Sequence, residues 1–278
     1  MILIDGLFNS GLFEGGLFNG GLFKQLSAWF TTSLFSNGEQ GAWYDPSDLS
    51  TLFQDASGTT PVTASGQLVG YVIDKSGNGN HASQATTSKK PVYRDVGGYR
   101  YLEFDGVDDC LITPAINFSS TDKQSIFIGL RQGTTAATRQ AIVELGTDYN
   151  GGDGRFALFV PSGTSSAEID FRVRGLYAVV CNVIGGHTAQ DKLAISCLAD
   201  LSADSMIVRR NGNIIGSNNS DLGNANFASN QKLYIGMRAG SSIPFSGYIY
   251  SLIVSGKNSS AYEIGASESY INSKTGAY

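Results

Sequence analysis

The chain of 278 residues contains 35 glycines and 6 prolines, and only 15% of its residues are charged. This composition favours strands joined by tight turns over long solvated helices, so we expect an all-β protein. The net charge of −5 argues against a nucleic-acid partner, and no apolar run approaches the ~20 residues of a membrane-spanning helix.

A repeat with a period of five residues lies near the start of the chain. Gly-Leu-Phe recurs between residues 6 and 23, separated by pairs of small or polar residues. A period of five matches neither the 3.6-residue period of a helix nor the alternation of a strand. The repeat places large apolar side chains at Leu7, Phe8, Leu12, Phe13, Leu17, Phe18, Leu22 and Phe23.

These Leu-Phe pairs predict an anchor that docks on a partner protein. A short, glycine-rich segment cannot bury so many large side chains by itself, and their exposure would invite aggregation. Insertion into pockets of another protein is the interpretation we favour. Two alternatives remain open: packing on the chain's own globular domain, or winding with copies of itself in a homotrimer. We expect residues 1–35 to form the anchor and a linker, and residues 36–278 to form the globular domain.

From Gly41 onward, short apolar runs alternate with turn residues at the spacing of ~8–12 residues that is typical of β-sandwiches. Clusters of glycine and asparagine, such as residues 76–80 and 211–213, supply the turns. A short C-terminal helix is expected near residues 260–273. The predicted strands are residues 70–73, 101–104, 125–130, 141–145, 155–160, 168–172, 177–183, 192–199, 206–210, 232–237 and 248–255.

The cysteines are Cys110, Cys181 and Cys197, an odd number without CxxC spacing. This pattern predicts neither a zinc cluster nor a complete disulfide framework, although one pair could form a bridge. We expect all three to be small buried residues within the strands.

Several segments resemble laminin-G-like domains of the concanavalin A-like lectin and glucanase class. They are residues 74–82 (DKSGNGNHA), 102–109 (LEFDGVDD), the turn at 211–212, 233–236 (LYIG) and 245–254 (FSGYIYSLIV). Together they cover about 200 residues, counted along the sequence. The resemblance implies a jelly-roll sandwich of two antiparallel sheets.

A narrower resemblance lies in residues 38–49 (GEQGAWYDPSDL), 52–55 and 58–62. This block is similar to the start of domains found in structural proteins of tailed bacteriophages. The resemblance implies a virion protein of the tail fibre, baseplate or capsid surface, assembled in the host cytoplasm. Its N-terminus would dock on other virion proteins, and its lectin-like domain would face host-surface glycan during attachment. A homo-oligomer, by analogy a trimer, suits such proteins. A capsid decoration protein without a ligand is one alternative.

Sugar binding needs an aromatic ring against which a pyranose packs, together with polar side chains that fix its hydroxyl groups. The loop that holds Tyr149, Asn150 and Asp153 supplies both, and we predict glycan binding there. The region around Tyr99 and Tyr101 is a second candidate of the same kind.

A calcium site is predicted where Asp105, Asp108 and Asp109 place three carboxylates within five residues. Oxygen clusters in loops coordinate Ca²⁺ when further oxygens complete the shell. In the alternative interpretation, Asp105 caps the turn with Gly106 and the other two carboxylates are solvated. A weaker acidic group lies around Tyr149, at Asp148, Asn150 and Asp153.

Another alternative function is that of a glycoside hydrolase. Residues 168–173 are similar to the strand of laminarinase-like β-glucanases that carries the catalytic carboxylates, but Val173 stands where that family has its second catalytic glutamate. Without a second carboxylate about 5 Å from the first, a retaining mechanism lacks its acid or its nucleophile. We therefore expect no catalytic residues and no enzyme activity. Of the two histidines, we expect His81 to be a structural hydrogen-bonder and His187 to lie in a loop.

Overall fold

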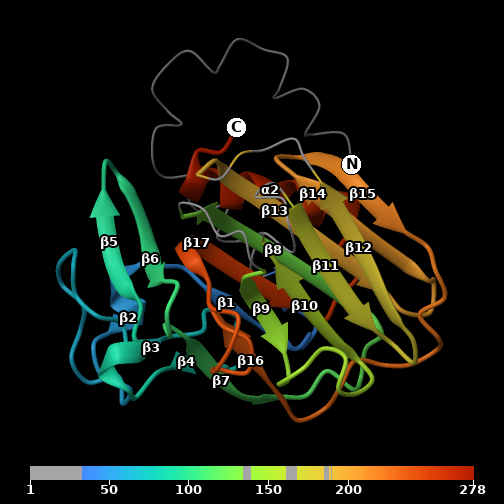
Figure 1. The fold of residues 1–278 in the computed structure, drawn as a ribbon, viewed down its shortest axis with the longest axis horizontal. Helices are drawn as coiled ribbons and strands as arrows, with labels where there is room; N and C mark the ends of the chain where they lie inside the picture. The colour runs from blue at the N-terminus through green and yellow to red at the C-terminus, as the bar shows by residue number, and fades with distance from the viewer. Residues whose placement is uncertain (1–32, 134–138, 161–167, 185–187, 189) are drawn as a thin grey trace.

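The computed structural model describes residues 33–133, 139–160, 168–184, 188 and 190–278. In this part of the chain, two antiparallel β-sheets stack face to face, as Figure 1 shows. The predicted two-sheet sandwich of the jelly-roll class is confirmed. The Gly-Leu-Phe repeat lies outside the described residues.

The first sheet has eight strands in the order β15-β14-β13-β8-β17-β6-β5, and β1 also pairs with β17. The hairpin of β5 and β6 forms one end of this sheet, at the left of Figure 1. The strands are β1 (Gly41–Tyr44), β5 (Val92–Val96), β6 (Tyr99–Asp105), β8 (Lys123–Gln132), β13 (Lys192–Asp200), β14 (Ser205–Arg210), β15 (Asn213–Asn218) and β17 (Ser246–Ser255).

The second sheet has nine strands in the order β12-β11-β10-β9-β16-β7-β4-β3-β2. Two short 3-10 helices, Leu49–Thr51 and Thr87–Lys89, lie in the β1–β2 and β4–β5 connections, which cross between the two sheets. The strands are β2 (Leu52–Phe53), β3 (Tyr71–Val72), β4 (Ala82–Ser83), β7 (Leu111–Ile116), β9 (Ala141–Leu145), β10 (Arg155–Phe159), β11 (Glu168–Arg174), β12 (Ala178–Ile184) and β16 (Gln231–Ile235).

Alternation along the strands builds the core between the two sheets. On β8, Ile126, Ile128 and Leu130 belong to the main apolar cluster, whereas Phe127 packs in a separate cluster with residues of the C-terminal helix. Successive side chains of a strand point to opposite faces, so β8 is apolar on both. This pattern requires that something cover the outer face of the eight-stranded sheet.

Helix α2 (Ala261–Thr275) provides that cover, and it confirms the helix predicted near residues 260–273. It begins with a capping box, in which the Ser260 side chain accepts from the backbone of Glu263 while the Glu263 carboxylate accepts from the backbone of Ser260. Gly129 of β8 permits close packing, since a Cβ there would lie 2.5 Å from Cγ2 of Thr275. No described helix is long and apolar enough to span a membrane.

The packing of the sandwich includes residues that precede the predicted boundary at residue 36. Leu34 and Phe35 are buried with Trp43, Ile253 and Tyr270 in the cluster beneath α2. The Ser255 hydroxyl also donates to the carbonyl oxygen of Leu34. Any truncation that is meant to spare the sandwich must therefore keep these two residues.

Candidate functional site

Partly exposed tyrosines lie together on the outer face of the eight-stranded sheet. Tyr99 and Tyr101 are alternate residues of β6, so their side chains share a face. Leu102, which points the other way, belongs to the core, so the face of the tyrosines is the outer one. The ring centroids of Tyr101 and Tyr248, which lies on β17, are 4.5 Å apart. Beneath them Tyr250 is 1% exposed, with its ring 5.1 Å from that of Tyr101. The strands thus hold several aromatic rings in one rigid layer.

These tyrosines remain accessible because α2 ends beside them. The helix packs on β13, β8 and β17, reaches β6 at its C-terminal end, and terminates at Gly276, which adopts a left-handed conformation. A Cβ on Gly276 would lie 2.7 Å from the hydroxyl oxygen of Tyr99, so the end of the helix lies against that ring. The boundary of the aromatic surface is therefore set by the length of the helix.

Charged residues extend the aromatic layer across neighbouring strands. Strand register places Tyr248 of β17 between Glu103 of β6 and Arg131 of β8. Arg131 in turn lies opposite Lys192 of β13. Arg94 on β5 donates to the Glu103 carboxylate at 2.5 Å. We call the following set the tyrosine patch: Tyr99, Tyr101, Tyr248, Arg94, Glu103, Arg131 and Lys192.

Two of its cations lie over aromatic rings. The guanidinium carbon of Arg131 is 5.4 Å from the ring centroid of Tyr248, and Nζ of Lys192 is 3.0 Å from that of Tyr99. Arg131 also donates through Nε to the carbonyl oxygen of Gln190 at 2.9 Å. Both cations are therefore fixed at the surface of the patch. Arg131, Lys192 and Tyr248 escaped the sequence analysis, because only strand register brings them beside Tyr99 and Tyr101.

The phenol group of Tyr101 is neutral at physiological pH. Burial raises the pKa of Tyr101, and the neighbouring Tyr248 and Glu103 raise it further. Burial also raises the pKa of Tyr250 to about 12. The Tyr101 hydroxyl can therefore donate and accept a hydrogen bond.

The predicted glycan loop lies on the opposite sheet and has a different character. Tyr149 is 9% exposed, and its ring lies 5.3 Å from the guanidinium of Arg172 and 5.7 Å from that of Arg238. Arg174 donates to the side chains of Asn150, at 2.8 Å, and Asp153, at 3.2 Å. The structure thus gathers the predicted residues around arginines, but Tyr149 offers no open ring for stacking. Their role in glycan binding stays a prediction.

Two fully buried carboxylates support these arginines. Asp170 accepts from Nε and Nη2 of Arg172. Oε1 of Glu144 accepts from the Tyr149 backbone at 2.7 Å and faces Nε of Arg238 at 3.4 Å, while Oε2 has no hydrogen-bond partner among the described residues. Burial raises the pKa of Glu144 to about 7.

The hydrolase alternative lacks the second catalytic acid that it requires at position 173 of β11. Val173 lies in the core, so it does not share a face with Asp170. The residue that does follow Asp170 on the outer face is Arg172, which neutralises it through a close ion pair. Position 173, where the resemblance requires the second catalytic acid, thus holds a core valine.

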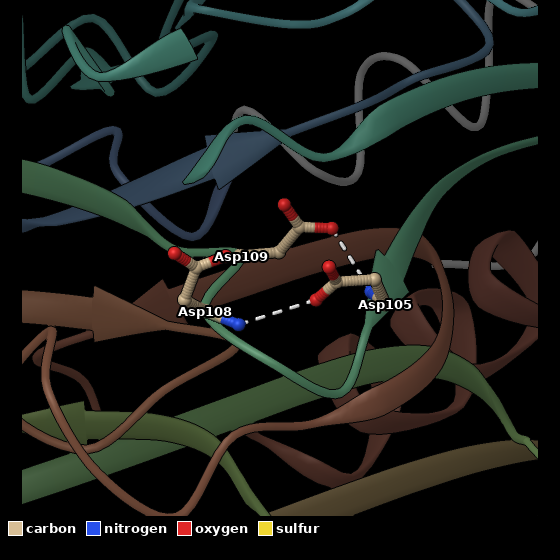
Figure 2. Close-up of side chains that lie close together, drawn as sticks. All are labelled: Asp105, Asp108 and Asp109. Carbon is tan, nitrogen blue, oxygen red and sulfur yellow. Dashed lines mark hydrogen bonds between the residues drawn. The ribbon is translucent and has the colours of Figure 1, made fainter. Parts of the chain in front are cut away.

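The predicted calcium ligands converge in the loop between β6 and β7, as Figure 2 shows. One oxygen of each of Asp105, Asp108 and Asp109 lies within 4.8 Å of the others, which is compatible with ligands at ~2.3–2.6 Å from one Ca²⁺. Oδ1 of Asp105 also accepts from the backbones of Val107 and Asp108, so the predicted turn cap is present. Asp109 is buried rather than solvated, and its burial raises its pKa to about 6. Calcium binding stays a prediction.

The remaining predicted residues have structural surroundings. Nδ1 of His81 accepts from the backbone of Asp74 at 3.0 Å, as expected of a structural hydrogen-bonder. Cys110, Cys181 and Cys197 are buried and free, although Cys110 lies just before β7 rather than within a strand. His187 lies outside the described residues.

Neither a protein-family model nor a curated protein matches the chain. Among solved structures, the binding domain of botulinum neurotoxin serotype G is 12% identical, with a TM-score of 0.55, over 72% of this chain and 48% of that one. The receptor binding domain of botulinum neurotoxin D is 11% identical, with a TM-score of 0.54, over 72% and 50% respectively.

A CBM40 domain of Ruminococcus gnavus IT-sialidase, solved with α2,3-sialyllactose, is 17% identical over 59% of this chain and 92% of that one, with a TM-score of 0.44. The chain spans about half the length of the neurotoxin structures that it matches. The neurotoxin matches show that the chain shares the fold of these β-sandwich domains.

Proposed function

We propose that this protein is a glycan-binding protein and that the tyrosine patch is its binding surface. The observation that carries the proposal is the layer formed by Tyr101 and Tyr248, partly exposed on rigid strands with ring centroids 4.5 Å apart. Pyranose rings present apolar C–H faces, which pack on aromatic rings of this kind. The fold, which this chain shares with the binding domain of botulinum neurotoxin serotype G, is compatible with that role.

The surroundings of the patch supply what a sugar needs besides stacking. Glu103 offers carboxylate oxygens, and Arg94 and Arg131 offer N–H donors at the edges of the rings. Saccharide hydroxyl groups both donate and accept, so a mixed set of this kind can fix their orientation. Because these side chains stand on paired strands, sugar binding would cost little conformational entropy of the protein.

We further infer that the protein is a virion component of a tailed phage, held on the tail fibre, baseplate or capsid surface by residues 6–23. The two-part sequence supports this inference, since the apolar repeat precedes a sandwich whose described residues form an extensive core. In this arrangement the sandwich is displayed for host attachment. A decoration protein without a ligand is the competing function, and it predicts that the patch binds no sugar.

A glycan array with the full chain tests the binding proposal. We expect binding to at least one class of saccharide, weakened about 10-fold or more by Tyr101→Ala and by Tyr248→Ala. Tyr262→Ala is the matched control, because Tyr262 is a 64% exposed tyrosine on α2, outside the patch. Equal thermal stability of the variants would show that a loss of binding is local. A flat array, or binding that survives both patch substitutions, would contradict the proposal.

A further inference from the structure

We infer that the tyrosine patch selects saccharides that carry an anionic group, a carboxylate or a sulfate. This inference rests on the proposed glycan binding and names the chemical class of the ligand. It follows from the charge of the patch, which differs from the charge of the whole chain.

The patch carries a local excess of positive charge. Its cations are Arg94, Arg131 and Lys192 and its one anion is Glu103, so the balance is three minus one, or +2, on a chain of net charge −5. Glu103 is already paired with Arg94. The excess therefore belongs to Arg131 and Lys192.

Neither of these two cations has a carboxylate partner among the described residues. Arg131 donates through Nε to the Gln190 carbonyl and, at 3.4 Å, through Nη2 to the Gln190 amide oxygen, both of which are neutral acceptors. Lys192 lies over the Tyr99 ring. Most other cations of the described chain pair with acids, as Arg172, Arg209 and Lys274 do. The surface beside the aromatic rings thus keeps two cations whose anion is not supplied by the described residues.

The arrangement suits a sugar with a charged substituent. Arg131 and Lys192 are opposite each other on β8 and β13, and the first also lies opposite Tyr248. A pyranose on the tyrosines would therefore direct a substituent toward these two cations. Guanidinium and ammonium groups bind carboxylate and sulfate by charge-assisted hydrogen bonds, which are about twice as strong as neutral ones.

A glycan array that carries neutral saccharides together with their uronate-bearing and sulfated forms tests the inference. For the full chain, we expect at least one acidic form to bind about 10-fold more tightly than its neutral parent, which is the effect of one such bond. The double variant Arg131→Gln/Lys192→Gln should lose this preference, so the ratio of acidic to neutral affinity, rather than either affinity alone, is the readout. Lys232→Gln is the control, since it removes an exposed cation from the opposite sheet.

The outcomes separate this inference from the proposed function. Equal binding of neutral and acidic forms through the tyrosines would overturn the charge selectivity and leave glycan binding intact. A preference that persists in the double variant would also overturn it, because other groups would then hold the anion. Absence of any binding by the unmodified chain would overturn both. A preference that weakens as salt is raised supports the inference.

Discussion

At the residue scale, the neighbours of an aromatic side chain decide whether its ring is exposed to a ligand. Tyr149 was predicted from its type to stack on sugars, yet its side chain is buried, with two arginines against its ring. Tyr101, of the same type, keeps a partly exposed ring because α2 ends beside Tyr99, at the start of β6. Sequence identifies both as candidates, but exposure depends on what lies above each ring. That neighbour comes from a distant part of the chain, so local pattern cannot reveal it.

Glu144 predicts a specific dependence of stability on pH. Its pKa is about 7 in the folded protein against an ordinary value of 4.5, so folding favours the protonated form. The contribution of Glu144 to the free energy of unfolding is then fully present below about pH 4.5 and is lost as the pH rises through 7. The charged groups that face it are Arg238, Arg155 and Asp148.

Urea unfolding at pH 5 and pH 8 measures this contribution. Between those values, the free energy of unfolding of the unmodified protein should fall by about 2 kcal/mol more than that of Glu144→Gln. The amide keeps the size of the side chain and cannot ionise, so the comparison isolates one group. Parallel pH profiles for the two proteins would show that the carboxyl of Glu144 is not the cause.

At the element scale, strongly patterned strands are predictable and short or polar ones are not. Each of the predicted runs is a strand, including β8, β13 and β17. The sequence analysis missed β2 and β4, which have two residues each, and β7, which contains Pro114. It also missed β1, β5 and β15; β15 is mostly polar and lies at the edge of its sheet. Pairing with strands distant in sequence holds β1 and β7, whereas β5 and β15 are held in hairpins with their neighbours β6 and β14.

The contact between α2 and β8 predicts a compensating pair of substitutions. Gly129→Ala should lower the free energy of unfolding by about 1–3 kcal/mol, because the new Cβ meets the buried Cγ2 of Thr275 at 2.5 Å. Thr275→Ser removes that methyl group and keeps the hydroxyl. Chemical denaturation of the double variant should therefore show partial recovery relative to the sum of the single effects. Strictly additive losses would mean that α2 does not pack on Gly129 as described.

At the scale of the whole molecule, the account assigns separate roles to the repeat and to the sandwich. The sandwich was predictable because many weak signals, such as residues 74–82 and 102–109, agree over most of the chain. The patch was only partly predictable, since pairing of strands far apart in sequence brings Lys192 to Tyr99 and Tyr248 to Tyr101.

Deletion of residues 6–23 tests the division of roles. The deletion spares Leu34 and Phe35, which pack beneath α2, so the thermal midpoint of the sandwich should be unchanged. Incorporation into particles, measured by quantitative blotting of purified virions, should be lost. Normal incorporation of the deleted chain would contradict an anchoring role for the Leu-Phe pairs.

The central claim is that sugars bind on the tyrosine patch, and a structure of the full chain with an acidic oligosaccharide chosen from the array tests it most directly. The account predicts a pyranose ring on Tyr101 and Tyr248, with its anionic group between Arg131 and Lys192. A sugar bound instead beside Tyr149 and Arg172, on the opposite sheet, would contradict it.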